Sequence, residues 1–271
     1  MKFTLNDRNK LNEEGFIIKK NILTSLEIEK IKKIILFNKE GKGGKDTLYP
    51  SNKFKILLKI LKLDFKKLAG GTFFLKLKKK LELDDYATNY FTHKAELKMI
   101  DGYYNKKSNN VILPWHSDQA YSGATNIKKI NSPDYYFLKI FFYLTKVSSN
   151  NGCTSYIPFS HKITYAVRTC LYQKEIAYQP FWSINDLVGI IEKKENYEKI
   201  RNKLSDKTLL DTFLLNAKKC ISDNSFSEYD FDADPGDVII FNECGVHKGS
   251  NPVVNDRIVL RYLYGKSKIE I

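Results

Sequence analysis

Hydrophobic residues follow different patterns in the first and the second part of the chain. The run GFIIKK at residues 15–20 is typical of a short strand, and the segment TSLEIEKIKKIILFNK follows from Thr24. In that segment apolar side chains recur at near-helical spacing, and Thr24 with Glu27 three positions later forms an N-terminal capping signal. The chain is therefore expected to open with a strand and an amphipathic helix.

The next region combines a turn signal with a longer helical pattern. GKGGKD at residues 41–46 predicts a flexible turn, and residues 54–92 predict mainly helix with a break at Gly70 and Gly71. The lysine run KLKKK near residue 76 is interpreted as a solvated helix face.

From about residue 95 the pattern changes to short runs of β-branched and aromatic residues between Asn, Gly, Ser, Pro and Asp clusters. The expected strands are ELKMIDGYYN, NVILPWH, YYFLKIFFYLTKV, TSYIPFSH, DVIIFN and RIVLRYLYG. Strands of this kind predict a jelly roll or barrel. Residues 163–229 interrupt them with a charged helical stretch, interpreted as an insertion within a single domain, 1–271, and as a possible lid over a site.

Composition places the chain among globular proteins, with 42% hydrophobic and 13% aromatic residues. Apolar runs fall short of the roughly 20 residues that span a bilayer, and the start MKFTLNDRNK has no apolar leader segment. Cys153, Cys170, Cys220 and Cys244 lack metal-site spacing, which indicates buried reduced thiols. A cytoplasmic protein without a membrane partner is expected.

The formal charge of +14 raises the possibility of a nucleic-acid partner. However, only five of the 45 basic residues are arginine, the residue that most often recognises phosphates and base edges. Lysines scattered along the chain indicate the general amino-acid composition of the source organism and not a binding surface, so nucleic acid is not expected as a partner.

The stretch PWHSDQAYSG at residues 114–123 holds the main candidate for chemistry. His116 and Asp118 are two apart at a strand end, so both side chains can face one point. Alone, such a pair is a weak signal, because it is common in surface loops. A third metal ligand has to come from elsewhere, and the candidates are His247, after the strand DVIIFN, and His161; His93 lacks an acidic partner and is interpreted as structural.

His247 is favoured because of the residues that follow it. Arg257 comes ten positions later and shares a strand face with Arg261. An arginine that points into a β core is costly unless an anion pairs with it, and a dicarboxylate cosubstrate would do so. Two imidazoles and one carboxylate on one octahedral face are the ligand set of non-haem iron(II) enzymes, with three positions left open.

Four blocks in order give a more specific indication. They are NEEGFIIKKNILTSLEIEKIKK, LPWHSDQAYSG, FFYLTKVSSNNGCTSYIPFSHK and PGDVIIFNECGVHKGSNPVVNDRIVLRYLYG. In these blocks the chain resembles the phytanoyl-CoA dioxygenase family of iron(II)- and 2-oxoglutarate-dependent oxygenases. The resemblance implies an α+β fold, with a double-stranded β-helix core (jelly roll, cupin-like) and flanking helices.

The resemblance also implies roles for individual residues. His116, Asp118 and His247 would hold iron, and Arg257 would bind the distal carboxylate of 2-oxoglutarate. Ser250 would assist Arg257, although the family usually has its serine one position earlier, where this chain has Gly249.

Two further assignments rest on the same resemblance. The family's Pro-Gly-Ser-His-Lys turn corresponds to residues 158–162, which marks His161 as structural. The cosubstrate pocket takes a polar residue from the strand before the His-x-Asp pair, and Tyr104 is the candidate.

The implied activity is hydroxylation of a small molecule, with O2 as second cosubstrate and with decarboxylation of 2-oxoglutarate to succinate. Asp118 favours hydroxylation because related halogenases lack this carboxylate. Gln119 and Tyr121, just past it, are expected to contact substrate. Alternative functions are a nucleic-acid or protein oxygenase on the same core, and a non-catalytic jelly-roll binding protein. The sequence leaves the substrate and the oligomeric state open.

Overall fold

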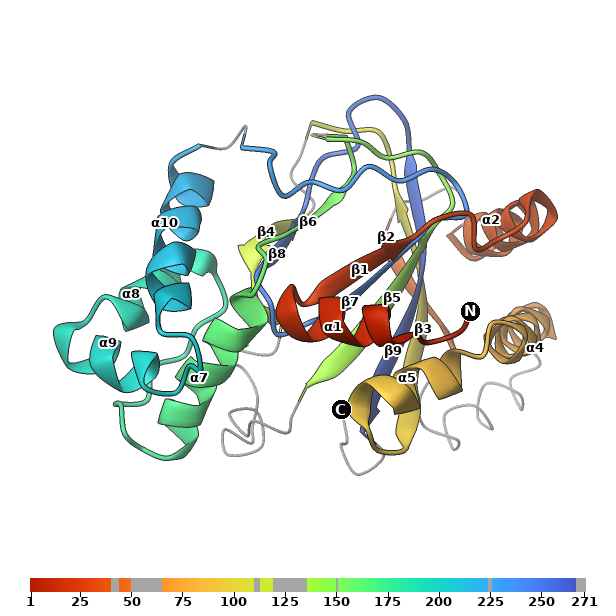
Figure 1. The fold of residues 1–271 in the computed structure, drawn as a ribbon. Coiled ribbons are helices and arrows are strands. Elements are labelled where there is room, and N and C mark those ends of the chain that lie inside the picture. Colours follow the sequence, from red (N-terminus) through yellow and green to blue (C-terminus); the bar gives the residue numbers. More distant parts are fainter. Residues whose placement is uncertain are drawn as a thin grey trace.

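The computed structural model describes residues 1–39, 44–49, 65–109, 113–118, 136–149, 151–223 and 226–266. Its described strands form two antiparallel sheets (Figure 1). The larger sheet has the order β1 (Phe16–Lys19), β7 (Val238–Asn242), β5 (Phe137–Tyr143), β9 (Arg257–Lys266), β3 (Ala95–Asn105) and β2 (Gly44–Tyr49). The smaller sheet has the order β4 (Leu113–His116), β8 (His247–Gly249) and β6 (Thr154–Tyr156).

The outer face of the larger sheet forms the main hydrophobic core. Every second residue of β9, from Ile258 to Tyr264, is buried there together with Leu138, Ile140 and Phe142 of β5. The helices that contribute apolar side chains to this core are α1 (Leu5–Glu13), α2 (Ser25–Lys39), α4 (Phe65–Lys80) and α5 (Leu83–Phe91). Burial of this face is the largest apolar contribution to the stability of the described part of the chain.

The inner face of the larger sheet packs against the smaller sheet. Phe141, Ile239 and Val259 share one apolar cluster with Tyr156 of the smaller sheet and with Cys153, which directly precedes β6. Two antiparallel sheets closed over such a core, with helices outside, form the jelly roll that the sequence predicts.

A second helical group covers the other side of the smaller sheet. Between β6 and β7 the chain forms α7 (Ser160–Tyr172), α8 (Ile184–Ile191), α9 (Lys194–Arg201) and α10 (Thr208–Ser222). Their apolar faces meet in a cluster of their own that includes Trp115, Ile157 and Val246. This helical lobe lies beside β4, β6 and β8 and away from α2 and α4 (Figure 1).

Three local expectations require correction. Helix α4 continues through Gly70 and Gly71, because burial of Phe74 and Leu77 against the core outweighs the low helix propensity of glycine. The turn expected at residues 41–46 overlaps β2, which pairs with β3 from Gly44 onward. The last residues of TSYIPFSH belong to α7, since that helix begins at Ser160.

Helix α1 was not predicted at all. It has little apolar periodicity, and a reciprocal cap between Thr4 and Asp7 fixes its first turn. No helix in the described ranges is both long and apolar enough to cross a membrane.

Candidate metal and cosubstrate site

Strand pairing brings the two predicted histidines of the metal site together. In the smaller sheet His116, the last residue of β4, is the direct partner of His247, the first residue of β8. Asp118 follows β4 by two residues, and its carboxylate oxygens lie 3.3 Å from His116 Nε2 and 3.2 Å from His247 Nε2. One ligand atom from each of the three residues lies within 4.8 Å of the others. Residues 131 positions apart thus form one compact donor set.

Both imidazole rings are oriented by the backbone. His116 Nδ1 lies 2.7 Å from the Pro114 carbonyl oxygen, and His247 Nδ1 lies 2.8 Å from that of Gly245. A carbonyl only accepts, so Nδ1 donates in each ring and the Nε2 lone pair remains for a metal. Backbone carbonyls that fix the tautomer in this way are typical outer partners of metal-bound histidine.

The charge state of these rings also suits a metal. Burial lowers the pKa of His116 to about 4, and burial together with the neighbouring His116 ring and the charge of Lys139 lowers the pKa of His247 well below its usual value. Both rings are therefore neutral near pH 7, as metal coordination requires. Two neutral imidazoles and a carboxylate are a ligand set that fits iron(II).

Arg257 provides a second, positively charged part of the site. It is 4% exposed, and its guanidinium donates to Asn105 Oδ1 at 3.3 Å and to Thr154 Oγ1 at 3.4 Å. Its Nε has no hydrogen-bond partner, and within the described ranges Arg257 forms no ion pair. A buried guanidinium without an anion is costly, so this position fits a carboxylate of a bound molecule.

The other two predicted cosubstrate residues are placed differently. The Ser250 hydroxyl lies 3.1 Å from Cys153 Sγ and 3.3 Å from the Cys153 carbonyl oxygen, one residue before Thr154. Tyr104 is buried in the outer core, and its hydroxyl donates to Asp256 Oδ2 at 2.8 Å. The structure therefore does not bring Tyr104 to the inner face, where Arg257 lies.

Tyr103 takes the inner position instead. It pairs with Val259, its ring lies 6.0 Å from that of Phe141, and Arg261 lies 5.5 Å above it. The face on which a strand residue lies depends on the register with the neighbouring strand, which composition does not reveal.

The predicted substrate contacts, Gln119 and Tyr121, lie outside the described residues. The two remaining histidines lie apart from the donor set. His161 is buried at the start of α7, with Nε2 3.1 Å from the Asn12 carbonyl oxygen, and His93 is exposed beside the Phe91 carbonyl oxygen.

Three residues at the site were missed by sequence reasoning. Lys139 of β5 forms an ion pair with Asp118 and lies 3.3 Å from Glu243 Oε2. The Trp182 ring, from the helical insertion, lies 4.9 Å from the His116 ring, and its carbonyl oxygen accepts from Ser117 N at 2.9 Å. A lysine in the middle of the apolar run YYFLKIFFYL was the available signal, because lysine is rarely buried without a partner. No comparable signal marks Trp182.

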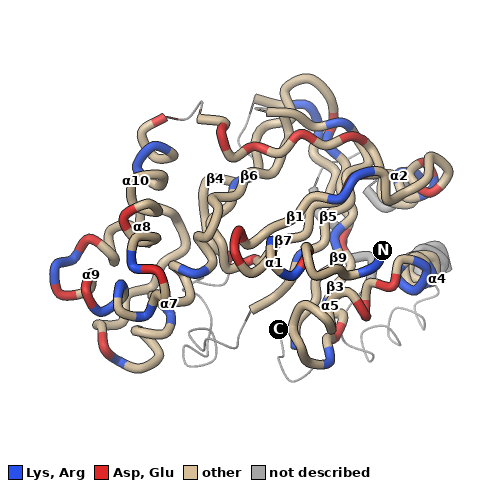
Figure 2. The backbone as a smooth tube through the Cα atoms, viewed as in Figure 1, with Lys and Arg blue, Asp and Glu red and all other residues tan. Residues whose placement is uncertain are grey.

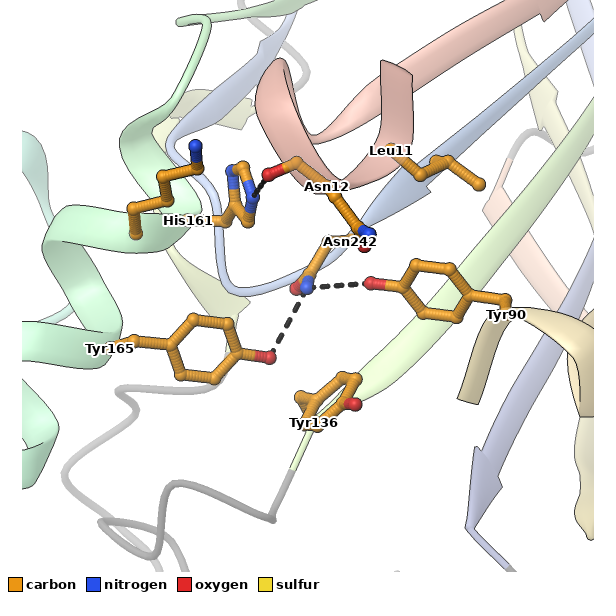
Figure 3. A pocket seen from close by; sticks show the side chains of 8 residues that line it. Leu11, Asn12, Tyr90, Tyr136, His161, Tyr165 and Asn242 are labelled. Carbon is orange, nitrogen blue, oxygen red and sulfur yellow. Dashed lines mark hydrogen bonds between the residues drawn. The ribbon is translucent and has the colours of Figure 1, made fainter. Parts of the chain in front are cut away.

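A pocket of about 430 Å³ lies outside this donor set (Figure 3). Tyr90 and Tyr165 line it, and the Asn242 side-chain amide donates to both hydroxyls, at 2.9 Å and 3.2 Å. Asn242 is the last residue of β7. None of the three metal-ligand candidates lines this pocket.

Several solved structures share this fold. HygX from Streptomyces hygroscopicus, solved with iron bound, is 15% identical with a TM-score of 0.54, over 99% of this chain and 89% of its own. EvdO2 from Micromonospora carbonacea var. aurantiaca, solved with 2-oxoglutarate, is 12% identical with a TM-score of 0.54, over 100% and 94%. SnoK, a non-haem α-ketoglutarate-dependent carbocyclase from nogalamycin biosynthesis, is 13% identical with a TM-score of 0.57, over 98% and 85%. At these identities the likeness establishes the fold.

Family membership rests on the sequence itself. None of the curated proteins matches the chain. The profile of the phytanoyl-CoA dioxygenase family matches residues 72–257, well over half of the chain, and that range includes His116, Asp118, His247 and Arg257. The chain therefore belongs to the phytanoyl-CoA dioxygenase family, and it is an enzyme of the iron- and 2-oxoglutarate-dependent oxygenase class.

Proposed function

We propose that this protein hydroxylates a small organic molecule, with iron(II) held by His116, Asp118 and His247 and with 2-oxoglutarate bound to Arg257. The observation that carries the proposal is the presence of two neutral imidazoles and one carboxylate at one point, together with a buried guanidinium that has no anionic partner among the described residues. Iron supplies oxygen activation when bound. The residues of the chain orient the metal and the cosubstrate and exclude water.

Arg257 and Ser250 have different parts in this proposal. The Arg257 guanidinium would bind the distal carboxylate of 2-oxoglutarate through two parallel charged hydrogen bonds. Ser250 would support the Arg257 site indirectly. Its hydroxyl contacts Cys153, and the next residue, Thr154, accepts a hydrogen bond from Arg257. Gln119 and Tyr121 stay proposed as substrate contacts because they follow Asp118 directly in the chain.

Burial of the metal ligands supports a small substrate. His116 and His247 are 1% and 5% exposed, and Trp182 of the helical insertion covers the His116 ring. A compact molecule reaches such buried ligands more easily than a folded macromolecule does. The insertion thus contributes to the wall of the site, as a lid over it would.

The charge distribution bears on the nucleic-acid alternative. Basic and acidic residues are interspersed along the described chain, in the helical lobe as well as around the larger sheet (Figure 2). An enzyme that acts on nucleic-acid strands would favour a continuous basic surface that leads to the iron.

Cytoplasmic location is part of the same proposal, since all four cysteines are free and buried.

Anaerobic addition of iron(II) and 2-oxoglutarate tests the proposed site. A visible metal-to-ligand charge-transfer band is expected, absent in His116→Ala and weakened in Arg257→Ala. If the unmodified protein gives no band, the proposed site is wrong.

A screen of candidate small molecules for stimulated succinate formation then tests the substrate class. Product mass identifies the reaction, because hydroxylation adds one oxygen atom, epimerisation leaves the mass unchanged, and desaturation removes a pair of hydrogens. Stimulation by DNA or RNA, sensitive to salt, would instead favour the macromolecular alternative.

A further inference from the structure

Lys139 is a charged residue in an otherwise apolar strand beside the metal ligands. All seven residues of β5 are buried, and Lys139 is 5% exposed. Its ammonium pairs with Asp118 Oδ2, lies 3.3 Å from Glu243 Oε2, and lies 5.7 Å from the centre of the Phe241 ring. A buried ammonium persists only when anionic partners offset its desolvation, and here two carboxylates do so.

The two oxygens of Asp118 have different surroundings. Oδ1 faces His116 Nε2 at 3.3 Å, whereas Oδ2 faces His247 Nε2 at 3.2 Å and also pairs with Lys139. A carboxylate can bind a metal through one oxygen or through both. A charged donor on one oxygen favours the one-oxygen mode, since that oxygen already accepts a strong hydrogen bond.

Glu243 determines what kind of influence Lys139 has. An isolated ammonium beside a dication would oppose metal binding by charge repulsion. The Glu243 carboxylate, itself 4% exposed, offsets most of that charge at short range. The Lys139–Glu243 pair therefore has almost no net charge at the position of the metal. Its main effect on the metal site is the hydrogen bond that Lys139 donates to Asp118 Oδ2.

We infer that Lys139 is a positioning residue that holds Asp118 as a one-oxygen metal ligand, and that Glu243 holds Lys139 in place. The inference rests on the proposed iron site and deepens it. With one oxygen of Asp118 and two imidazoles bound, three coordination positions stay open for the two donor atoms of 2-oxoglutarate and for O2. Binding through both oxygens would occupy one of these positions and compete with the cosubstrate.

Cobalt(II) titration tests this inference without turnover, because the visible spectrum of cobalt reports its coordination. The main variant is Lys139→Met with Glu243→Gln, which removes the Lys139–Glu243 pair as a neutral unit and leaves Asp118 with the two histidines and the metal as its partners. We expect its cobalt affinity to fall by about 10- to 100-fold, the usual effect of losing an outer partner of a metal ligand. Its spectrum should change, and 2-oxoglutarate should bind the cobalt protein more weakly.

Two further variants separate positioning from general damage. Lys139→Arg keeps a charged donor and should retain most of the cobalt and 2-oxoglutarate affinity of the unmodified protein. Glu243→Gln alone removes the carboxylate that holds the Lys139 ammonium in place, so its cobalt affinity should fall. This variant provides the test if the double variant does not fold. The matched control is Lys98→Met, because Lys98 is also 5% exposed but pairs with Glu96 at 2.9 Å. It should bind cobalt normally.

The outcomes are distinguishable from failure of the proposed function. If the unmodified protein binds neither cobalt nor iron, the iron site itself is wrong. If it binds cobalt and the folded double variant binds cobalt and 2-oxoglutarate as tightly or more tightly, with the same spectrum, the role of Lys139 is wrong. Should the double variant not fold, unchanged affinities and spectrum in Glu243→Gln would have the same meaning.

Discussion

The two faces of strand β9 carry side chains of opposite kinds. On the outer face Ile258, Leu260, Tyr262 and Tyr264 pack into the main core against the helices. On the inner face Arg257 and Arg261 alternate with apolar residues, and Arg261 pairs with the fully buried Asp101. One continuous apolar-looking run, RIVLRYLYG, therefore serves two different purposes.

The comparison shows how stability and chemistry are divided within one element. Apolar burial on the outer face stabilises the fold, and the stable sheet can then hold desolvated charge on its inner face. Charge held in this way costs stability locally until a ligand compensates it. Substitutions on the two faces should consequently have effects of different kinds.

Loss of a metal ligand should have the largest effect on the inner side. In His247→Ala we expect iron affinity and turnover to fall by more than the roughly 10- to 100-fold that loss of an outer partner costs. The melting temperature of the metal-free protein should stay close to that of the unmodified protein, because the outer core is intact. Metal content after dialysis and succinate formation measure the effect. His93→Ala, at an exposed histidine, is the control, and equal losses in both variants would contradict the assignment.

A cavity in the outer core should lower the stability of the protein and leave ligand binding unchanged. Leu260 is fully buried, and Leu260→Ala should lower the free energy of unfolding by about 2–5 kcal/mol. Iron and 2-oxoglutarate affinity should be unchanged in the folded variant. Urea unfolding and ligand titration check this pair of results, and a weakened cosubstrate affinity with intact stability would disprove the division between the two faces.

The buried histidines should lower the free energy of unfolding at acidic pH. Burial lowers the pKa of His161 to about 4, from about 6.5 in the unfolded chain, so below pH 6.5 the unfolded chain binds a proton that the folded protein does not. Stability therefore falls as the pH drops from about 6.5 towards 4, by up to ~3 kcal/mol for this one group.

Urea unfolding of metal-free protein at pH 7 and pH 5 measures this loss. In His161→Gln the difference between the two pH values should be smaller. Added metal should stabilise the folded protein but leave the contribution of His161 unchanged, because His161 lies outside the donor set. An equal loss in the variant and the unmodified protein would exclude His161 as a cause.

Removal of the Arg257 charge, which has no anionic partner among the described residues, should give the smallest effect of the four, and it should be the only change that does not lower stability. Arg257→Met should cost roughly 1.5–3 kcal/mol of 2-oxoglutarate binding, which is the value of hydrogen bonds to a charged group. The free energy of unfolding should stay equal or rise, because a buried unpaired charge is replaced by an apolar chain of similar length. Calorimetric titration and urea unfolding test both parts. Lower stability with unchanged 2-oxoglutarate affinity would show that Arg257 is structural.

Much of the site was predictable because its signals are local. His116 and Asp118 are two residues apart at a strand end, and Arg257 is a charge in an apolar strand, so each is visible within a few positions. Tyr104 was predicted from the family resemblance, yet the structure places it in the outer core. Register between β3 and β9 decides which of two adjacent tyrosines faces inward, and a register shift between Leu97 and Met99 alters the alternation.

The sequence by itself determined the class of elements, the jelly-roll expectation, two of the proposed metal ligands and the candidate arginine, because side-chain periodicity and local spacing encode them. Only the tertiary structure decided which residues meet across long distances. It paired His116 with His247, brought Lys139 and Glu243 to Asp118, and laid Trp182 against His116. Such contacts depend on sheet pairing and on the packing of an inserted helical lobe. Those are properties of the whole fold, and no short segment specifies them.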